Sequence, residues 1–65
     1  MKLYMILYAG SVIGGTWGPL PYDMDECLTR AAEGNAKVQT HEKTKGWLFS
    51  CEYRATRPEL GELKP

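Results

Sequence analysis

The chain has 65 residues, with eight acidic and eight basic side chains, a formal net charge of zero and a hydrophobic content of 43%. This length predicts one domain, which buries only about 60% of the surface that its unfolded form exposes. The balanced charge weighs against nucleic acid as a partner, since such binding neutralises many phosphates at once. The window from Leu3 to Tyr22 carries no charge, but its glycines and prolines are too frequent for a membrane span or a signal peptide. We therefore expect no membrane association.

Residues 2–8 predict a strand in which Tyr4, Ile6 and Tyr8 alternate with aliphatic side chains. Both faces of this strand are apolar, as in a central strand that is covered on its two sides. A domain of this size has few elements to cover both faces. We expect either that two copies pair through the tyrosine face or that the loop over residues 10–21 folds back over it.

The loop predicted over residues 10–21 contains the most motif-like stretch of the chain. Its glycines follow a strand and precede a helix, as in a phosphate-binding loop, but Thr16 occupies the position where that loop needs lysine. We therefore interpret the glycines as a turn. Trp17, Leu20 and Tyr22 stand among Gly and Pro, so they either present an aromatic binding surface or cap the open face of the sheet.

A helix is predicted to begin after Asp23, which is a good N-cap residue and can form a capping box with Glu26. Apolar residues then recur at helical spacing and form a stripe that can pack on a sheet. The stripe consists of Met24, Cys27, Leu28, Ala31 and Ala32. Gly34 is expected to end the helix in a left-handed conformation.

Period-two alternation after Asn35 predicts a hairpin, with strands at about residues 38–44 and 47–54 and a turn at Lys45–Gly46. The fold class is thus α+β: a small antiparallel or mixed three-stranded sheet with one helix packed on one face, in the order β-loop-α-β-β. Residues 1–55 form the single domain, and residues 56–65 form an irregular C-terminal tail. The side chains of the last strand that are expected to face the helix are Trp47, Phe49, Cys51 and Tyr53.

Cys27 and Cys51 lie in different segments and form no Cys-x-x-Cys pair. We expect both to be reduced and buried in the core of a cytoplasmic protein. We predict no catalytic, metal-binding or cofactor-binding residue, because His41 is the only histidine and helix capping explains the acidic residues that follow Tyr22. We therefore do not expect an enzyme.

Binding to a macromolecule is the function that these observations favour. The expected partner is a protein or a host protein complex, and the chain is also expected to form a homodimer. In its size and its lack of enzymatic motifs, the chain resembles accessory proteins of phages or mobile elements, including the anti-CRISPR proteins that inhibit a host defence complex. The residues predicted to bind the partner are Trp17, Leu20, Tyr22, Tyr4 and Tyr8.

The alternative is a small nucleic-acid-binding module that uses the basic segment over residues 37–57. Its lysines and arginines would contact phosphates, while Trp47 or Tyr53 stacks on bases. The residues predicted for this alternative are Lys37, Lys43, Lys45, Arg54 and Arg57.

Overall fold

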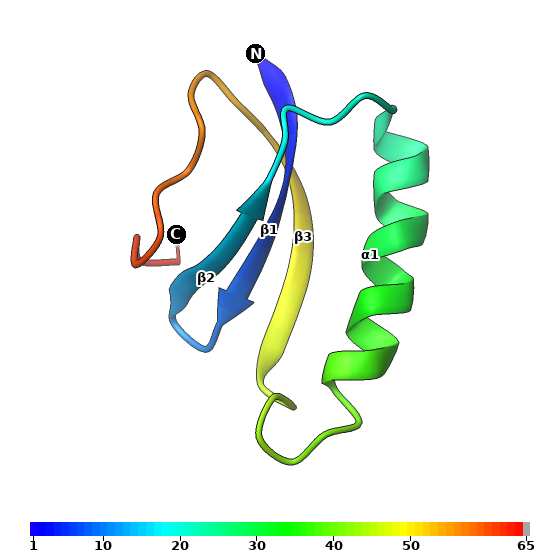
Figure 1. Ribbon diagram of the computed structural model, residues 1–65, viewed down its shortest axis with the longest axis vertical. Helices are drawn as coiled ribbons and strands as arrows, with labels where there is room; N and C mark the ends of the chain where they lie inside the picture. The colour runs from blue at the N-terminus through cyan, green and yellow to red at the C-terminus, as the bar shows by residue number, and fades with distance from the viewer. Residues whose placement is uncertain (65) are drawn as a thin grey trace.

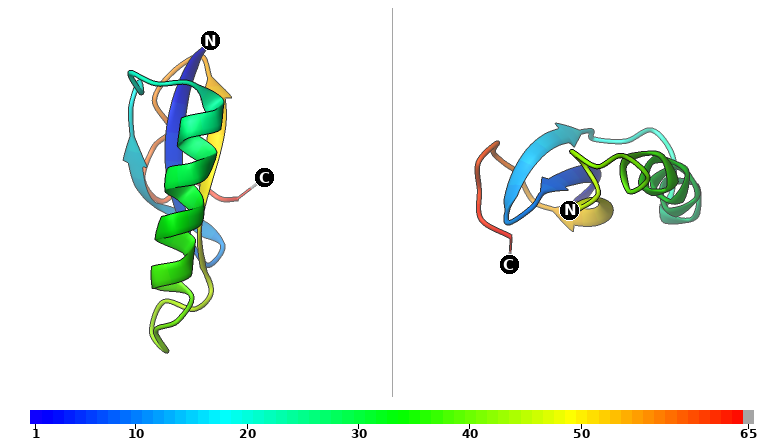
Figure 2. Two further views of the ribbon diagram at one scale, coloured as in Figure 1. Left: turned by 90° about the vertical axis from the view of Figure 1, so that its right-hand side faces the viewer. Right: turned by 90° about the horizontal axis from the view of Figure 1, so that it is seen from below.

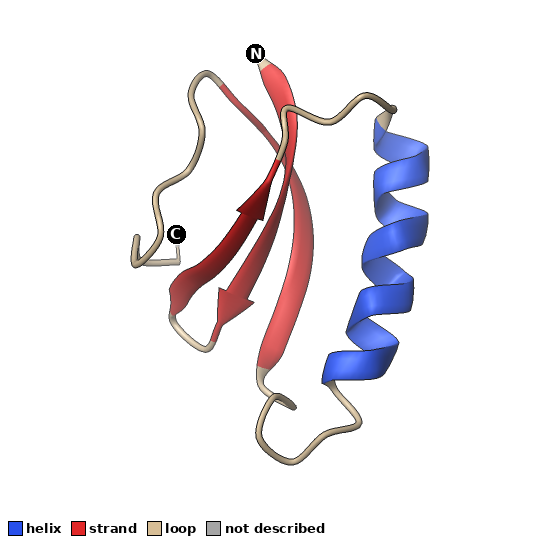
Figure 3. Cartoon of the chain, in the orientation of Figure 1, coloured by secondary structure: helices blue, strands red, loops and turns tan. Residues whose placement is uncertain are grey.

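The computed structural model describes residues 1–64, which form three strands and one helix. The elements are β1 (Lys2–Ala9), β2 (Val12–Trp17), α1 (Met24–Val38) and β3 (Trp47–Arg54), as Figures 1 and 3 show. The strands form one antiparallel sheet in the order β2-β1-β3, so β1 is central. The predicted α+β class, with a three-stranded sheet and one helix on one face, is confirmed. The order along the chain differs, because it is β-β-α-β and not β-loop-α-β-β.

The second strand lies within residues 10–21, where a loop was predicted. Gly10 has a φ of 72°, which lets Gly10 and Ser11 connect β1 and β2 in a tight hairpin. Leu7 pairs with Gly15 and Tyr8 pairs with Ile13, so Gly14 is the extra residue of a β-bulge. The glycines that predicted a turn therefore belong partly to a bulged strand.

The bulge decides which way the side chains of β2 point. Cross-strand partners share a face of the sheet. Trp17 pairs with Met5 and lies on the helix side, whereas Ile13 pairs with Tyr8 and lies on the opposite side. Two residues four apart would otherwise share one face.

The helix begins where it was predicted, since the side chain of Asp23 accepts a hydrogen bond of 3.0 Å from the backbone N–H of Glu26. It continues past Gly34 to Val38, so the predicted helix end is wrong. Gly34 is needed inside the helix, because a Cβ there would lie 2.7 Å from Cδ2 of Phe49. The strand predicted over residues 38–44 is also wrong, because the end of α1 and turns occupy this segment.

Side chains of α1 close part of the outer edge of β3. Asn35 accepts a hydrogen bond of 2.6 Å from the N–H of Phe49 and donates one of 3.2 Å to its carbonyl. Gln39, the residue that caps the C-terminal end of α1, donates to the carbonyl of Trp47. The amide side chains thus take the place of a fourth strand at this end of the edge.

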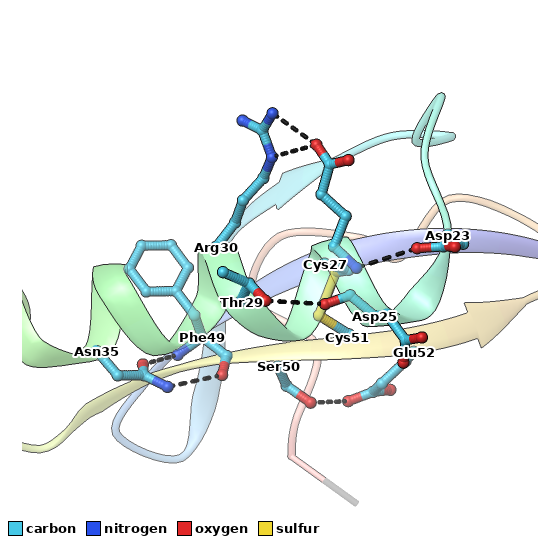
Figure 4. The surroundings of a disulfide bond; sticks show 11 residues. Asp23, Asp25, Cys27, Thr29, Arg30, Asn35, Phe49, Ser50, Cys51 and Glu52 are labelled. Carbon is cyan, nitrogen blue, oxygen red and sulfur yellow. Dashed lines mark hydrogen bonds and ion pairs between the residues drawn. A yellow bond between two sulfur atoms is a disulfide. The ribbon is translucent and has the colours of Figure 1, made fainter.

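Cys27 and Cys51 are joined in a disulfide, with their Cα atoms 6.2 Å apart (Figure 4). The prediction that both are reduced is therefore wrong. Cys27 is fully buried as expected, whereas Cys51 is only half-buried. The physical reason is the register: the inward stripe of α1 and the inward side of β3 bring the two side chains opposite each other. The disulfide links the second turn of the helix to the edge strand of the sheet.

The sheet lies between two layers, α1 on one face and the C-terminal tail on the other (Figure 2). The face under the tail carries the most deeply buried cluster, in which each side chain is at most 4% exposed: Tyr4, Ile6, Tyr8 and Ile13. A second copy or the loop over residues 10–21 was expected to cover this face. In the structure, the tail covers it.

Candidate protein-binding surface

Trp17 lies at the open side of the sheet. Helix α1 contacts β3 and, less closely, β1, whereas the helix-side face of β2 is not covered by it. The ring of Trp17 folds over Gly15, where a Cβ would lie 2.9 Å from Cη2 of the indole. Its centroid is 5.7 Å from that of the Phe49 ring. The residue is therefore fixed in place, while 46% of it is exposed.

The loop from Gly18 to Asp23 presents less than was predicted. Leu20 is half-buried, and its N–H donates a hydrogen bond of 2.9 Å to the carbonyl of Leu3. Tyr22 is half-buried too, with the guanidinium of Arg30 4.6 Å from its ring centroid. Of the three side chains, Trp17 is thus exposed, while Leu20 and Tyr22 are held against the body of the domain.

Tyr4 and Tyr8, the other two predicted partner-binding residues, are buried under the tail. The guanidinium of Arg57 lies 6.0 Å from the ring centroid of Tyr4, and Nζ of Lys64 lies 5.6 Å from that of Tyr8. A partner reaches neither ring while the tail stays in place. Three of the five predicted residues therefore remain at the surface, and they belong to β2 and the segment that follows it.

A polar network secures the tail to the sheet. Tyr8 donates a hydrogen bond of 2.6 Å to Glu52, and Arg54 pairs with Glu52 at 3.2 Å and with Glu62 of the tail at 2.9 Å. Burial raises the pKa of Glu52, but the hydrogen bonds from Tyr8, Arg54 and Ser50 outweigh it and leave the pKa below its usual value. Burial and the bond to Glu52 raise the pKa of Tyr8. At neutral pH the network is a carboxylate that accepts from a phenol and a guanidinium.

The residues predicted to bind nucleic acid fall into two separate groups. Lys37 lies in the last turn of α1, and Lys43 and Lys45 lie in the turns after it. A hollow of about 590 Å³ lies beside this first group, lined in part by His41 and Lys43.

The second group lies at the other end of β3, where Arg54 is the last residue of the strand and Arg57 follows in the tail. Arg54 is paired with two carboxylates, and Arg57 donates to the carbonyl of Gly18 and to the hydroxyl of Thr16. These arginines hold the tail in place, which leaves the lysine group as the candidate phosphate-binding surface.

Several exposed apolar side chains were not predicted to lie at the surface. Leu28 was placed in the packed stripe of the helix, yet 52% of it is exposed, and Tyr53 is exposed to the same extent. The helix packs mainly against one strand, so its buried stripe is narrower than the apolar stripe of the sequence. Leu60 and Leu63 of the tail also point to solvent.

Within residues 1–64, no group of three His, Cys, Asp or Glu side chains is placed to hold a metal ion. Helix α1 lacks the length and the apolar run that a membrane-crossing helix needs. No family model matches the chain, and neither a curated protein nor a solved structure matches it.

Proposed function

We propose that the chain is a non-enzymatic binding protein that recognises a protein partner through a surface centred on Trp17 and continued by Leu20 and Tyr22. The half-exposed indole of Trp17, packed against Gly15 and Phe49, carries the proposal. Tryptophan is enriched among interface residues whose truncation costs at least about 2 kcal/mol of binding energy. Because the ring is already held in one place, less conformational entropy is lost when a partner covers it.

The test is affinity capture from the lysate of the native host, followed by mass spectrometry of the retained proteins. The bait is the chain itself, and Trp17→Ala is the variant. Tyr53→Ala is the matched control, because Tyr53 is an exposed aromatic residue on β3 at the other edge of the sheet. We expect one stoichiometric host protein or complex that survives high salt, is lost with Trp17→Ala and is kept with Tyr53→Ala. Equal capture by Trp17→Ala would contradict the proposal.

We further propose that the binding inhibits a host complex, as in the accessory proteins that the chain resembles in size. This role requires a cytoplasmic protein, and the cytoplasm keeps most thiols reduced. The Cys27–Cys51 disulfide favours an oxidising compartment instead. The test is to quench host cells with acid and alkylate the denatured chain before any reductant is added. Labelling of both cysteines supports the inhibitor role, and protection of both contradicts it.

Nucleic acid is the second candidate, supported by the lysines that gather near the end of α1. Lys43→Ala combined with Lys45→Ala is expected to reduce both the affinity for DNA or RNA and its dependence on salt. Unchanged binding in the double variant, or binding without salt dependence, would remove this candidate.

A further inference from the structure

The C-terminal tail is held to β2 largely through its backbone. Ile13 donates to the carbonyl of Glu62 and accepts from the N–H of Gly61, at 2.8 and 2.7 Å. Lys64 donates to the carbonyl of Ser11, in the turn before β2, at 2.8 Å, and Leu63 forms an antiparallel bridge with Val12. The tail thus extends the sheet antiparallel to β2 by a short stretch.

The tail buries little of itself, although the face beneath it is deeply buried. Pro58 is its one buried side chain among residues 55–64, while Leu60 and Leu63 are 69% and 72% exposed. In contrast, Ile6 and Tyr8 on the sheet are 0% and 2% exposed. Departure of the tail would therefore expose an aromatic face that needs another cover, while the tail itself would lose few buried contacts.

The connection between β3 and the tail passes through Ala55 and Thr56, which are both exposed. A short exposed connection lets the tail leave the body without unfolding the sheet. Every copy of the chain carries a segment that fits the vacated face. In this segment Arg57 lies over Tyr4, Pro58 is buried and Lys64 lies over Tyr8.

We propose that the tyrosine face is also an interface for a second copy of this chain, which covers it with its own tail. Each tail of the pair lies on the sheet of the other copy, and every contact of the closed form is made again. Such an exchange closes with two-fold symmetry and needs no new contact surface. A tail on a short connection competes at an effective concentration in the millimolar range, so exchanged dimers form as the protein concentration approaches roughly 1 mM.

The test uses two variants of the full chain, each with one new cysteine. Val12 and Leu63 are bridge partners between β2 and the tail, flanked by the backbone hydrogen bonds described above. Chains with Val12→Cys are mixed with chains with Leu63→Cys, incubated at rising concentration and treated with a short bis-maleimide, which leaves the native disulfide intact. We expect a covalent heterodimer whose yield rises with concentration, because only an exchanged tail brings one cysteine of each chain together.

The control replaces Val12→Cys by Ala32→Cys, an exposed position on the helix that lies on the other side of the sheet. Random collision would give the same yield of heterodimer in both mixtures, and equal yields would overturn the proposal. The absence of any heterodimer near 1 mM would overturn it too. A chain with both Val12→Cys and Leu63→Cys must crosslink within itself at low concentration. If it does not, the tail is not docked as described and the proposal also fails.

Discussion

Reduction of the Cys27–Cys51 disulfide is expected to remove a large part of the stability of this domain. The linked residues are 24 apart in sequence, and closing a loop of this size in the unfolded chain corresponds to about 3.4 kcal/mol at 25 °C. A domain of 65 residues has a total free energy of unfolding of roughly 3–10 kcal/mol. The disulfide therefore contributes between a third and all of the free energy of unfolding.

The packing of α1 explains why little else compensates. Cys27 and Ala31 are its only buried residues, Gly34 has no side chain to pack, and Asn35 contacts β3 through hydrogen bonds. Once the covalent link is gone, burial of a few small side chains has to hold the helix on the sheet, and each buried methylene contributes only about 0.8 kcal/mol.

The assay is urea unfolding of the same chain with and without a phosphine reductant, followed by far-ultraviolet circular dichroism. We expect the free energy of unfolding to fall by about 3.4 kcal/mol and the melting temperature by roughly 15–25 °C. The slope of the free energy against urea concentration should increase, because the reduced unfolded chain exposes more surface. The double variant Cys27→Ala with Cys51→Ala controls for the reductant, which should leave it unaffected. A stability unchanged on reduction would refute the reasoning, because the loop-closure argument leaves no route to that result.

Three further predictions concern single side chains. Gly34→Ala should destabilise the fold by about 1–3 kcal/mol in thermal or urea unfolding, because its methyl group would collide with the ring of Phe49, whereas Gly46→Ala, where a Cβ meets nothing within 4 Å, should be neutral. Asn35→Ala should cost about 1–3 kcal/mol by leaving two backbone groups of β3 unpaired, and faster hydrogen exchange at the N–H of Phe49 should accompany it. The lowered pKa of Glu52 contributes stability that is fully present above the usual carboxyl pKa of 4.5 and is lost as the pH falls below it, so a pH titration of stability should be flatter in Glu52→Gln than in the natural chain.

Local sequence signals predicted the elements that are stabilised locally. Asp23 and Glu26 fixed the start of the helix, and alternation within residues 47–53 identified the inward side of β3, because capping and period-two patterning act within a few residues. The first strand was recognised for the same reason, and its two apolar faces correctly indicated that both would be covered.

Features that depend on distant partners were not predictable. Gly34 continues the helix only because the ring of Phe49 occupies the space beside it, and helix propensity alone favours a stop at that position. The disulfide depends on the register between α1 and β3, which no local pattern specifies. The tail has no periodicity, so no local pattern predicts its place on the sheet, where it covers Tyr4 and Tyr8. The exposure of Trp17 follows from the exposure of the helix-side face of β2, which α1 does not cover.

The bulge at Gly14 lets β2 contribute side chains to the apolar layers on both faces of the sheet, under the helix side and under the tail. With regular alternation, Ile13 and Trp17, which are four residues apart, would lie on one face of the sheet and could contact only one of these layers. The added residue reverses the parity between Ile13 and Trp17, so the same short strand places one anchor under the tail and the other on the helix side. The bulge and the length of β2 are therefore linked. A strand that kept all six residues but lost the bulge would turn one of the two anchors away from its layer, whereas deletion of Gly14 itself would leave Ile13 and Trp17 three residues apart and still on opposite faces.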